Sequence, residues 1–176
     1  MKKILCSLLA LVLSFSAMAD VAEERKEIKD MRQKILTSLY KEEPSVKGKI
    51  ANSAGYATFS NIGINLFLIS TGNGSGIVKN NDTGKENYMK MFSAGVGIGL
   101  GIKDFSVVFV FHSEEALNAF IEDGWDFSGQ ADAAAKSGEK GGEGSTSGTA
   151  VEGVEIFQMT ENGLALQATL QGTKYW

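Results

Sequence analysis

The hydrophobic residues of this chain follow a helical period up to residue 53 and mostly a two-residue period from Gly55 onward. Between Asp20 and Glu43 they recur at three- and four-residue steps, which predicts an amphipathic helix. Pro44 ends this helix or begins the next, and a second short helix is expected at 45–53. The apolar stripe of the first helix consists of Ile28, Met31, Ile35, Leu36, Leu39 and Tyr40.

Beyond Gly55, β-branched and aromatic runs separated by turn residues predict antiparallel strands. An internal helix is expected to begin at Ser113, which can cap it, and to end at Gly124. About eight strands are expected, over 55–59, 62–70, 86–92, 93–103, 105–112, 125–135, 151–160 and 164–175, the last two as a closing hairpin. Residues 72–76 predict a turn or a close backbone approach, 80–84 a hairpin turn, and 136–149 a long glycine-rich loop.

These elements predict an α+β fold. We expect a mainly antiparallel β-sheet sandwich or barrel-like body, with two N-terminal helices and one internal helix.

The first residues have the features of an export signal. A positively charged start precedes the apolar run Ile4–Phe15, and the small residues Ala17 and Ala19 follow at signal-peptidase spacing. Cleavage is expected before Asp20, and a retained N-terminal anchor is the alternative. The expected organisation is a signal peptide at 1–19, an amphipathic helix at 20–43 and one domain at 44–176, in a periplasmic protein.

Composition argues against several classes of function. The chain has 17 basic and 21 acidic residues, and loss of the two leader lysines leaves 15 against 21, a net charge of −6. This acidity argues against nucleic-acid binding. One cysteine and one histidine exclude Cys/His zinc sites and disulfide frameworks. His112 and Ser113 would point to opposite faces of a strand, so we expect a structural role for His112, no catalysis and no cofactor.

Four glycines alternate with apolar residues at Gly95, Gly97, Gly99 and Gly101. They do not form a nucleotide-binding fingerprint, because position 100 is leucine and a strand rather than a helix follows. Their two-residue period places them on one flat face of a strand, which other groups can approach closely. That face can pack internally or line a ligand groove, and both interpretations remain open.

Several stretches of the β-rich body occur together and in a characteristic order. They are Ser53–Ala57, Gly74–Val78, Tyr88–Met91, the glycine alternation, Lys103–Phe105, Val107–Phe111, Trp125–Phe127, Gly129–Lys136, Thr160–Ala168 and Gly172–Trp176. In these stretches the body resembles the bacterial SYLF (Ysc84-type) domain.

The resemblance implies a non-enzymatic lipid-binding protein of the cell envelope, whose partner is phospholipid or a membrane surface. Its headgroup contacts would be exposed lysines, and acyl chains would lie near the glycine alternation. The candidate lysines are Lys47, Lys49, Lys85 and Lys90.

Eukaryotic members of the family bind lipid through a basic amphipathic helix. Its counterpart at 20–43 carries seven acidic and six basic residues, so we expect Arg25, Lys26, Lys29 and Arg32 to form a solvated face, with pairs such as Asp30–Lys34 within the helix. Two alternatives remain: a small outer-membrane β-barrel, and an envelope structural or interaction protein without a lipid ligand.

Overall fold

The computed structural model of the chain describes residues 2–66, 69–96, 105–126, 149–151, 153–160, 163–164 and 173–176. Its helices are α1 (Lys2–Glu42), α2 (Val46–Ala51) and α3 (Glu114–Asp123). Its strands are β1 (Gly55–Leu66), β2 (Ile69–Asn80), β3 (Glu86–Val96), β4 (Phe105–Phe111), β5 (Trp125–Asp126), β6 (Thr149–Val151), β7 (Val154–Thr160), β8 (Gly163–Leu164) and β9 (Thr173–Tyr175).

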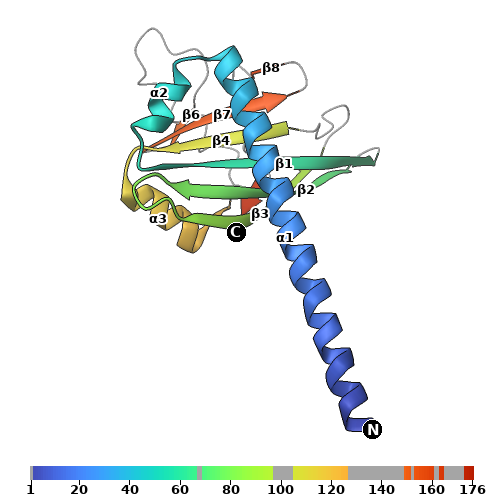
Figure 1. Ribbon diagram of the computed structural model, residues 1–176. Helices are drawn as coiled ribbons and strands as arrows, with labels where there is room; N and C mark the ends of the chain where they lie inside the picture. Colours follow the sequence, from blue (N-terminus) through green and yellow to red (C-terminus); the bar gives the residue numbers. More distant parts are fainter. Residues whose placement is uncertain are drawn as a thin grey trace.

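The described strands form one antiparallel sheet in the order β5-β9-β3-β2-β1-β4-β7-β6, with β8 paired to β7. The sheet curls, and α1 and α2 lie on one of its faces while α3 lies at the other side (Figure 1). The expected α+β class, antiparallel pairing and barrel-like form are therefore confirmed, together with the three helices.

The two faces of the sheet bury separate hydrophobic clusters, because successive strand residues point to opposite sides. On the face covered by α1 and α2, which we call the helix face, Leu39, Val46, Val108 and Phe157 pack together. The opposite face holds an aromatic cluster against α3. Its rings are Phe59, Phe109, Phe111, Phe120, Trp125 and Tyr175, with centroids 4.8–6.4 Å apart.

Helix α1 has two parts that differ in their surroundings. Its C-terminal part crosses the sheet, and its N-terminal part projects away from the body (Figure 1). The apolar stripe predicted from the sequence is the part that packs, with Ile28, Ile35 and Leu39 buried, whereas residues 20–27 are exposed. The helix begins at Lys2 and continues through the expected cleavage point, so the predicted element at 20–43 forms its second half.

Three turns or caps expected from the sequence are confirmed. Gly84, in the connection between β2 and β3, has a φ of 70°. Ser113 caps α3 by accepting a hydrogen bond from the Ala116 N–H at 3.2 Å. Gly124 ends α3 with a φ of 66°, a conformation that residues with a Cβ rarely adopt.

Four strand predictions are wrong. The expected boundary between 86–92 and 93–103 is absent, because β3 continues from Glu86 to Val96. Residues 62–70 are not one strand, because β1 ends at Leu66 and pairs with β2 from Ile69. Residues 151–160 are broken at Gly153, whose φ of 76° separates β6 from β7. The predicted strand 164–175 does not pair throughout with 151–160, since β9 joins β3 and β5 on the other side of the sheet.

The segment 72–76 lies inside β2, so the predicted turn is wrong and the predicted close backbone approach is right. Three predictions lie outside the described residues. They concern Gly97, Gly99 and Gly101, the predicted strand 125–135 beyond Asp126, and the predicted loop at 136–148.

Candidate functional site

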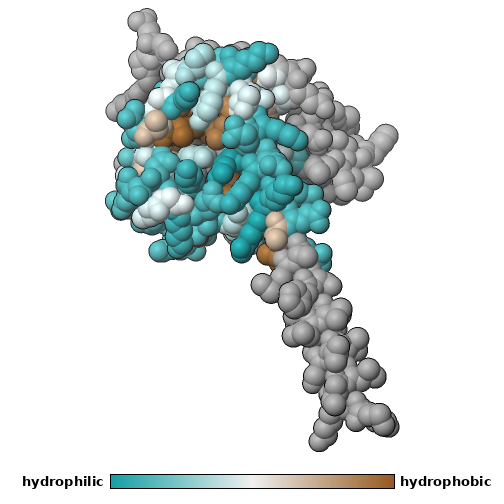
Figure 2. Space-filling model, in the orientation of Figure 1, coloured by the Kyte–Doolittle hydropathy of each residue, from teal (hydrophilic) through white to brown (hydrophobic). Residues whose placement is uncertain are grey.

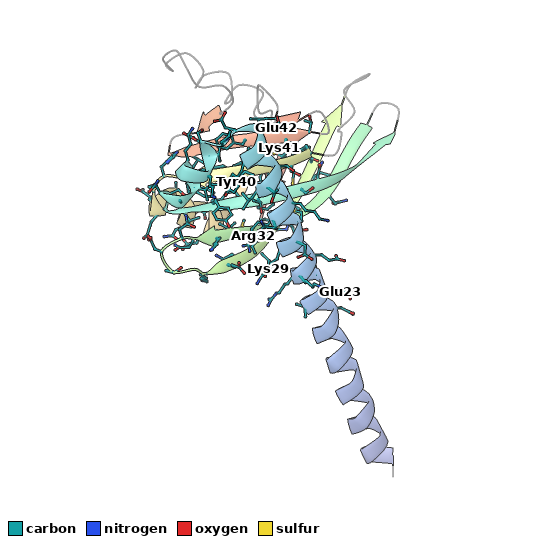
Figure 3. The ribbon with its side chains drawn as sticks, turned by 45° about the horizontal axis from the view of Figure 1, so that its top comes forward. Glu23, Lys29, Arg32, Tyr40, Lys41 and Glu42 are labelled. Carbon is teal, nitrogen blue, oxygen red and sulfur yellow. The ribbon has the colours of Figure 1, made fainter. Side chains whose placement is uncertain are left out.

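One flank of α1 is attached to β3 by charged side chains. Lys29 Nζ lies 2.9 Å from Glu86 Oε2, and Arg32 Nη1 donates to Glu86 Oε1 at 2.7 Å. We call these three residues the Glu86 cluster. One helical turn before Lys29, the guanidinium of Arg25 lies 5.0 Å from the centre of the Tyr88 ring. Figure 3 shows Lys29 and Arg32 on the part of α1 that crosses the sheet, whereas Glu23 lies where the helix leaves it.

Within the Glu86 cluster, Glu86 and Lys29 each stabilise the charged form of the other. Hydrogen bonds from Lys29 and Arg32 lower the pKa of Glu86, and the hydrogen bond to Glu86 raises the pKa of Lys29. Arg32 and Glu86 are largely covered, with side chains 17% and 22% exposed. Three of the four basic residues considered for lipid contact, Arg25, Lys29 and Arg32, therefore have partners within the protein, while Lys26 is exposed.

The other flank of α1 is open. Two hollows, of about 290 and 390 Å³, lie along it and adjoin because Ser60 lines both. Their lining residues on the helix recur at the three- and four-residue spacing of a single stripe, and their floor is formed by the neighbouring strands β2, β1, β4 and β7. We call them together the α1 groove. Its helical lining is Glu24, Glu27, Ile28, Met31, Lys34, Ile35 and Ser38.

The chemistry of the α1 groove differs between its two ends. The end over β4 and β7 is lined by Lys34, Ser60, Ser106 and Met159, and the Ser106 hydroxyl lies 3.4 Å from that of Ser60. Phe105 borders this end but packs in the cluster on the opposite face of the sheet. The end over β2 is lined on the helix by Ile28 and Met31, with Glu24 and Glu27 at the part of α1 that leaves the sheet, and its floor is polar. The floor residues are Ser60, Asn73, Gly74 and Ser75. The expected Asp30–Lys34 pair is absent from the ion pairs of the described residues, so Lys34 faces the groove without a carboxylate partner among them.

A second apolar area lies on the same face, between α1 and α2. Figure 2 shows hydrophobic residues there within a mainly hydrophilic surface. This area belongs to the cluster that α1 and α2 form with β1, β4 and β7, and its members Leu36, Ile50 and Tyr56 are 6–7% exposed. These three residues are therefore nearly covered by the contact of α1 and α2 with the sheet.

The lysines predicted as headgroup contacts lie outside the lining of the α1 groove. Lys47 is exposed on α2, Lys85 is exposed in the connection between β2 and β3, and Lys90 is exposed on β3. Lys49 pairs with Glu155 at 3.0 Å and lies 5.7 Å from the centre of the Phe157 ring. Of the predicted glycine face, Gly95 lies in β3 opposite Ser70.

A different glycine alternation has a clear packing role. Gly72, Gly74 and Gly76 follow a two-residue period in β2, on the face opposite α1. A Cβ at Gly72 would lie 2.6 Å from Asn61 Nδ2, one at Gly74 would collide with Ser60 O, and one at Gly76 would collide with the Phe59 ring. The spacing of these glycines could have identified them, but glycine and asparagine in 72–76 favoured a turn, so no strand was predicted there.

The histidine of the chain takes part in a contact on the surface. His112 Nε2 lies 3.6 Å from Glu155 Oε1, beside Lys49, and the His112 side chain is 45% exposed. Within the described ranges, no cluster of three or more His, Cys, Asp or Glu residues could hold a metal ion. In the same ranges, no helix combines the length and hydropathy needed to cross a membrane.

Comparison with known proteins gives one similarity and one negative result. The chain is 36% identical over 156 residues to Beta cell expansion factor A of Aeromonas veronii. The aligned region covers 88% of this chain but 57% of the other protein, so the chain spans little more than half of its relative. No protein-family profile matches the sequence.

Proposed function

We propose that the chain is a non-enzymatic phospholipid-binding protein of the bacterial cell envelope, exported to the periplasm by residues 1–19. The observation that carries the proposal is the α1 groove, in which an amphipathic helix leaves one flank open above a sheet face. The groove combines the apolar side chains Ile28, Met31, Ile35 and Met159 with polar and charged residues at both of its ends, and such a mixed lining can hold an amphiphilic ligand. The resemblance of residues 44–176 to the SYLF domain supports the same class of ligand.

Lipid recognition in this protein has to be local. The chain without its leader carries a net charge of −6, which opposes general attraction to an anionic membrane. Arg25, Lys29 and Arg32 are engaged with Glu86 and Tyr88, so they add little attraction for lipid phosphates. The cations that remain available to a lipid headgroup are Lys34 in the groove and the exposed Lys47, Lys85 and Lys90.

Flotation tests the proposal directly. Residues 20–176 are mixed with vesicles of phosphatidylethanolamine and phosphatidylglycerol and centrifuged through a density gradient, and lipid copurifying with the protein is sought by mass spectrometry. We expect flotation with the vesicles, or bound lipid in the purified protein. Failure of both, across neutral and anionic phospholipids, would contradict the proposal; a protein partner captured without lipid would then favour the interaction-protein alternative.

A second candidate function follows from the similarity to a protein whose name describes expansion of beta cells. In this proposal the chain acts on such cells after release from the bacterium. Purified residues 20–176 are added to cultured beta cells, and cell number is compared with that in buffer alone. An unchanged cell number would contradict this second function and leave lipid binding unaffected.

A further inference from the structure

We propose that the α1 groove holds one acyl chain of a single-chain anionic amphiphile, with the anionic headgroup at Lys34 and the chain directed toward Met31 and Ile28. This inference rests on the proposed lipid-binding function and specifies which ligand the groove binds and in which direction it lies. It differs from binding to a bilayer surface, because the ligand lies along the helix and between α1 and the sheet.

The dimensions of the groove suit one chain. Its helical lining runs from Glu24 to Ser38, which is about 21 Å at the rise of an α-helix. The acyl layer of one membrane leaflet, half of the hydrocarbon core, is about 15 Å deep. A single extended chain plus a headgroup therefore matches the length, and the two hollows follow one another along α1 and do not lie side by side.

The charges of the groove fix the direction of the ligand. Lys34 lines one end, where the hydroxyls of Ser38 and Ser60 can also donate to an anion, while the Ser106 hydroxyl donates to Ser60 Oγ at 3.4 Å. Glu24 and Glu27 line the other end and repel an anion there. An anionic headgroup is therefore favoured only at the Lys34 end, and this arrangement places the chain over Met31 and Ile28.

The test measures displacement of a fluorescent long-chain fatty acid from residues 20–176. Hexadecanoate is compared with octanoate and with the neutral hexadecanol. We expect hexadecanoate to bind more tightly than either competitor, because octanoate fills part of the groove and hexadecanol lacks the charge that Lys34 attracts.

Two variants with matched controls locate the ligand. Lys34→Gln should weaken hexadecanoate binding about tenfold, whereas Lys26→Gln, an equal charge change on an exposed site outside the groove, should leave it unchanged. Ser75→Trp places a large ring in the end of the groove over β2 and should reduce binding, whereas Ser75→Ala should not. Circular dichroism and thermal unfolding of each variant confirm that it is folded.

The outcomes separate this inference from the proposed function. The inference is overturned if the protein does not bind hexadecanoate, or if Lys34→Gln and Ser75→Trp leave that binding unchanged. Either result overturns it even if the protein still floats with phospholipid vesicles. Loss of both flotation and fatty-acid binding overturns the two together. Equal binding of hexadecanol and hexadecanoate overturns the role of Lys34 in recognition.

Discussion

At the scale of single residues, the glycines differ in whether the surrounding atoms leave room for a side chain. A Cβ at Gly76 would collide with the Phe59 ring and with Thr58 O, whereas a Cβ at Gly48 in α2 would meet no atom within 4 Å. We expect Gly76→Ala to lower the free energy of unfolding by about 2 kcal/mol, because a packed core resists added volume. The matched Gly48→Ala should raise it by about 0.5 kcal/mol, because alanine favours a helix.

Urea unfolding of the two variants checks this prediction. If both substitutions changed the free energy of unfolding by the same amount, the close packing of β2 against β1 would be contradicted. The same reasoning applies to Gly72, whose missing side chain leaves room for the buried Asn61. Asn61 donates to Ser93 Oγ at 3.1 Å and accepts from the Phe105 N–H at 2.9 Å, so β1, β3 and β4 meet at this residue.

At the scale of elements, the Glu86 cluster attaches α1 to β3. The pKa of Glu86 lies below its ordinary value of 4.5, so its contribution to stability is present above that pH and is lost as the pH falls through the lower value. The pKa of Lys29 lies above 10.5, so its contribution is present below that pH and is lost as the pH rises through the higher value.

We therefore expect Glu86→Gln to lower the free energy of unfolding by about 1 kcal/mol between pH 5 and 10 and by much less below pH 4. Thermal or urea unfolding across this pH range measures the difference, and high salt should reduce it. Glu122→Gln on the exposed side of α3 is the control and should show no such profile. A constant difference at all pH values would contradict an ionic role for Glu86.

Local signals in the sequence predicted the helices better than the strand pairings. The stripe from Ile28 to Leu39 and the cap at Ser113 are properties of neighbouring residues, and both were found. The end of β1 at Leu66 falls in an apolar run without glycine, proline or asparagine nearby on its C-terminal side, so no turn was predicted there.

Contacts between residues that are distant in sequence could not be predicted from these local signals. The charge spacing favoured pairs within α1, yet Lys29 and Arg32 reach Glu86 on β3, and β9 joins β3 across the sheet. The α1 groove was missed for the same reason, since its lining combines one flank of a helix with four strands that are distant in sequence.

At the scale of the whole molecule, the projecting half of α1 is separable from the body. Among the described side chains of α1, the first that contacts the rest of the body is Arg25 and the first that lines the groove is Glu24, so both lie after the expected cleavage point. Removal of residues 1–19 would leave the Glu86 cluster, the groove and both hydrophobic clusters intact.

We therefore expect residues 20–176 to unfold with the same free energy as the full chain, within about 0.5 kcal/mol. In a bacterial host, intact mass and N-terminal sequencing of the periplasmic fraction should find a chain that begins at Asp20. Ala19→Phe should block this processing, because signal peptidase requires a small residue there, and Ala22→Phe should not. If the full chain were recovered from the membrane fraction with its first residues retained, those residues would be an anchor, and the groove would be held close to the membrane by α1 itself.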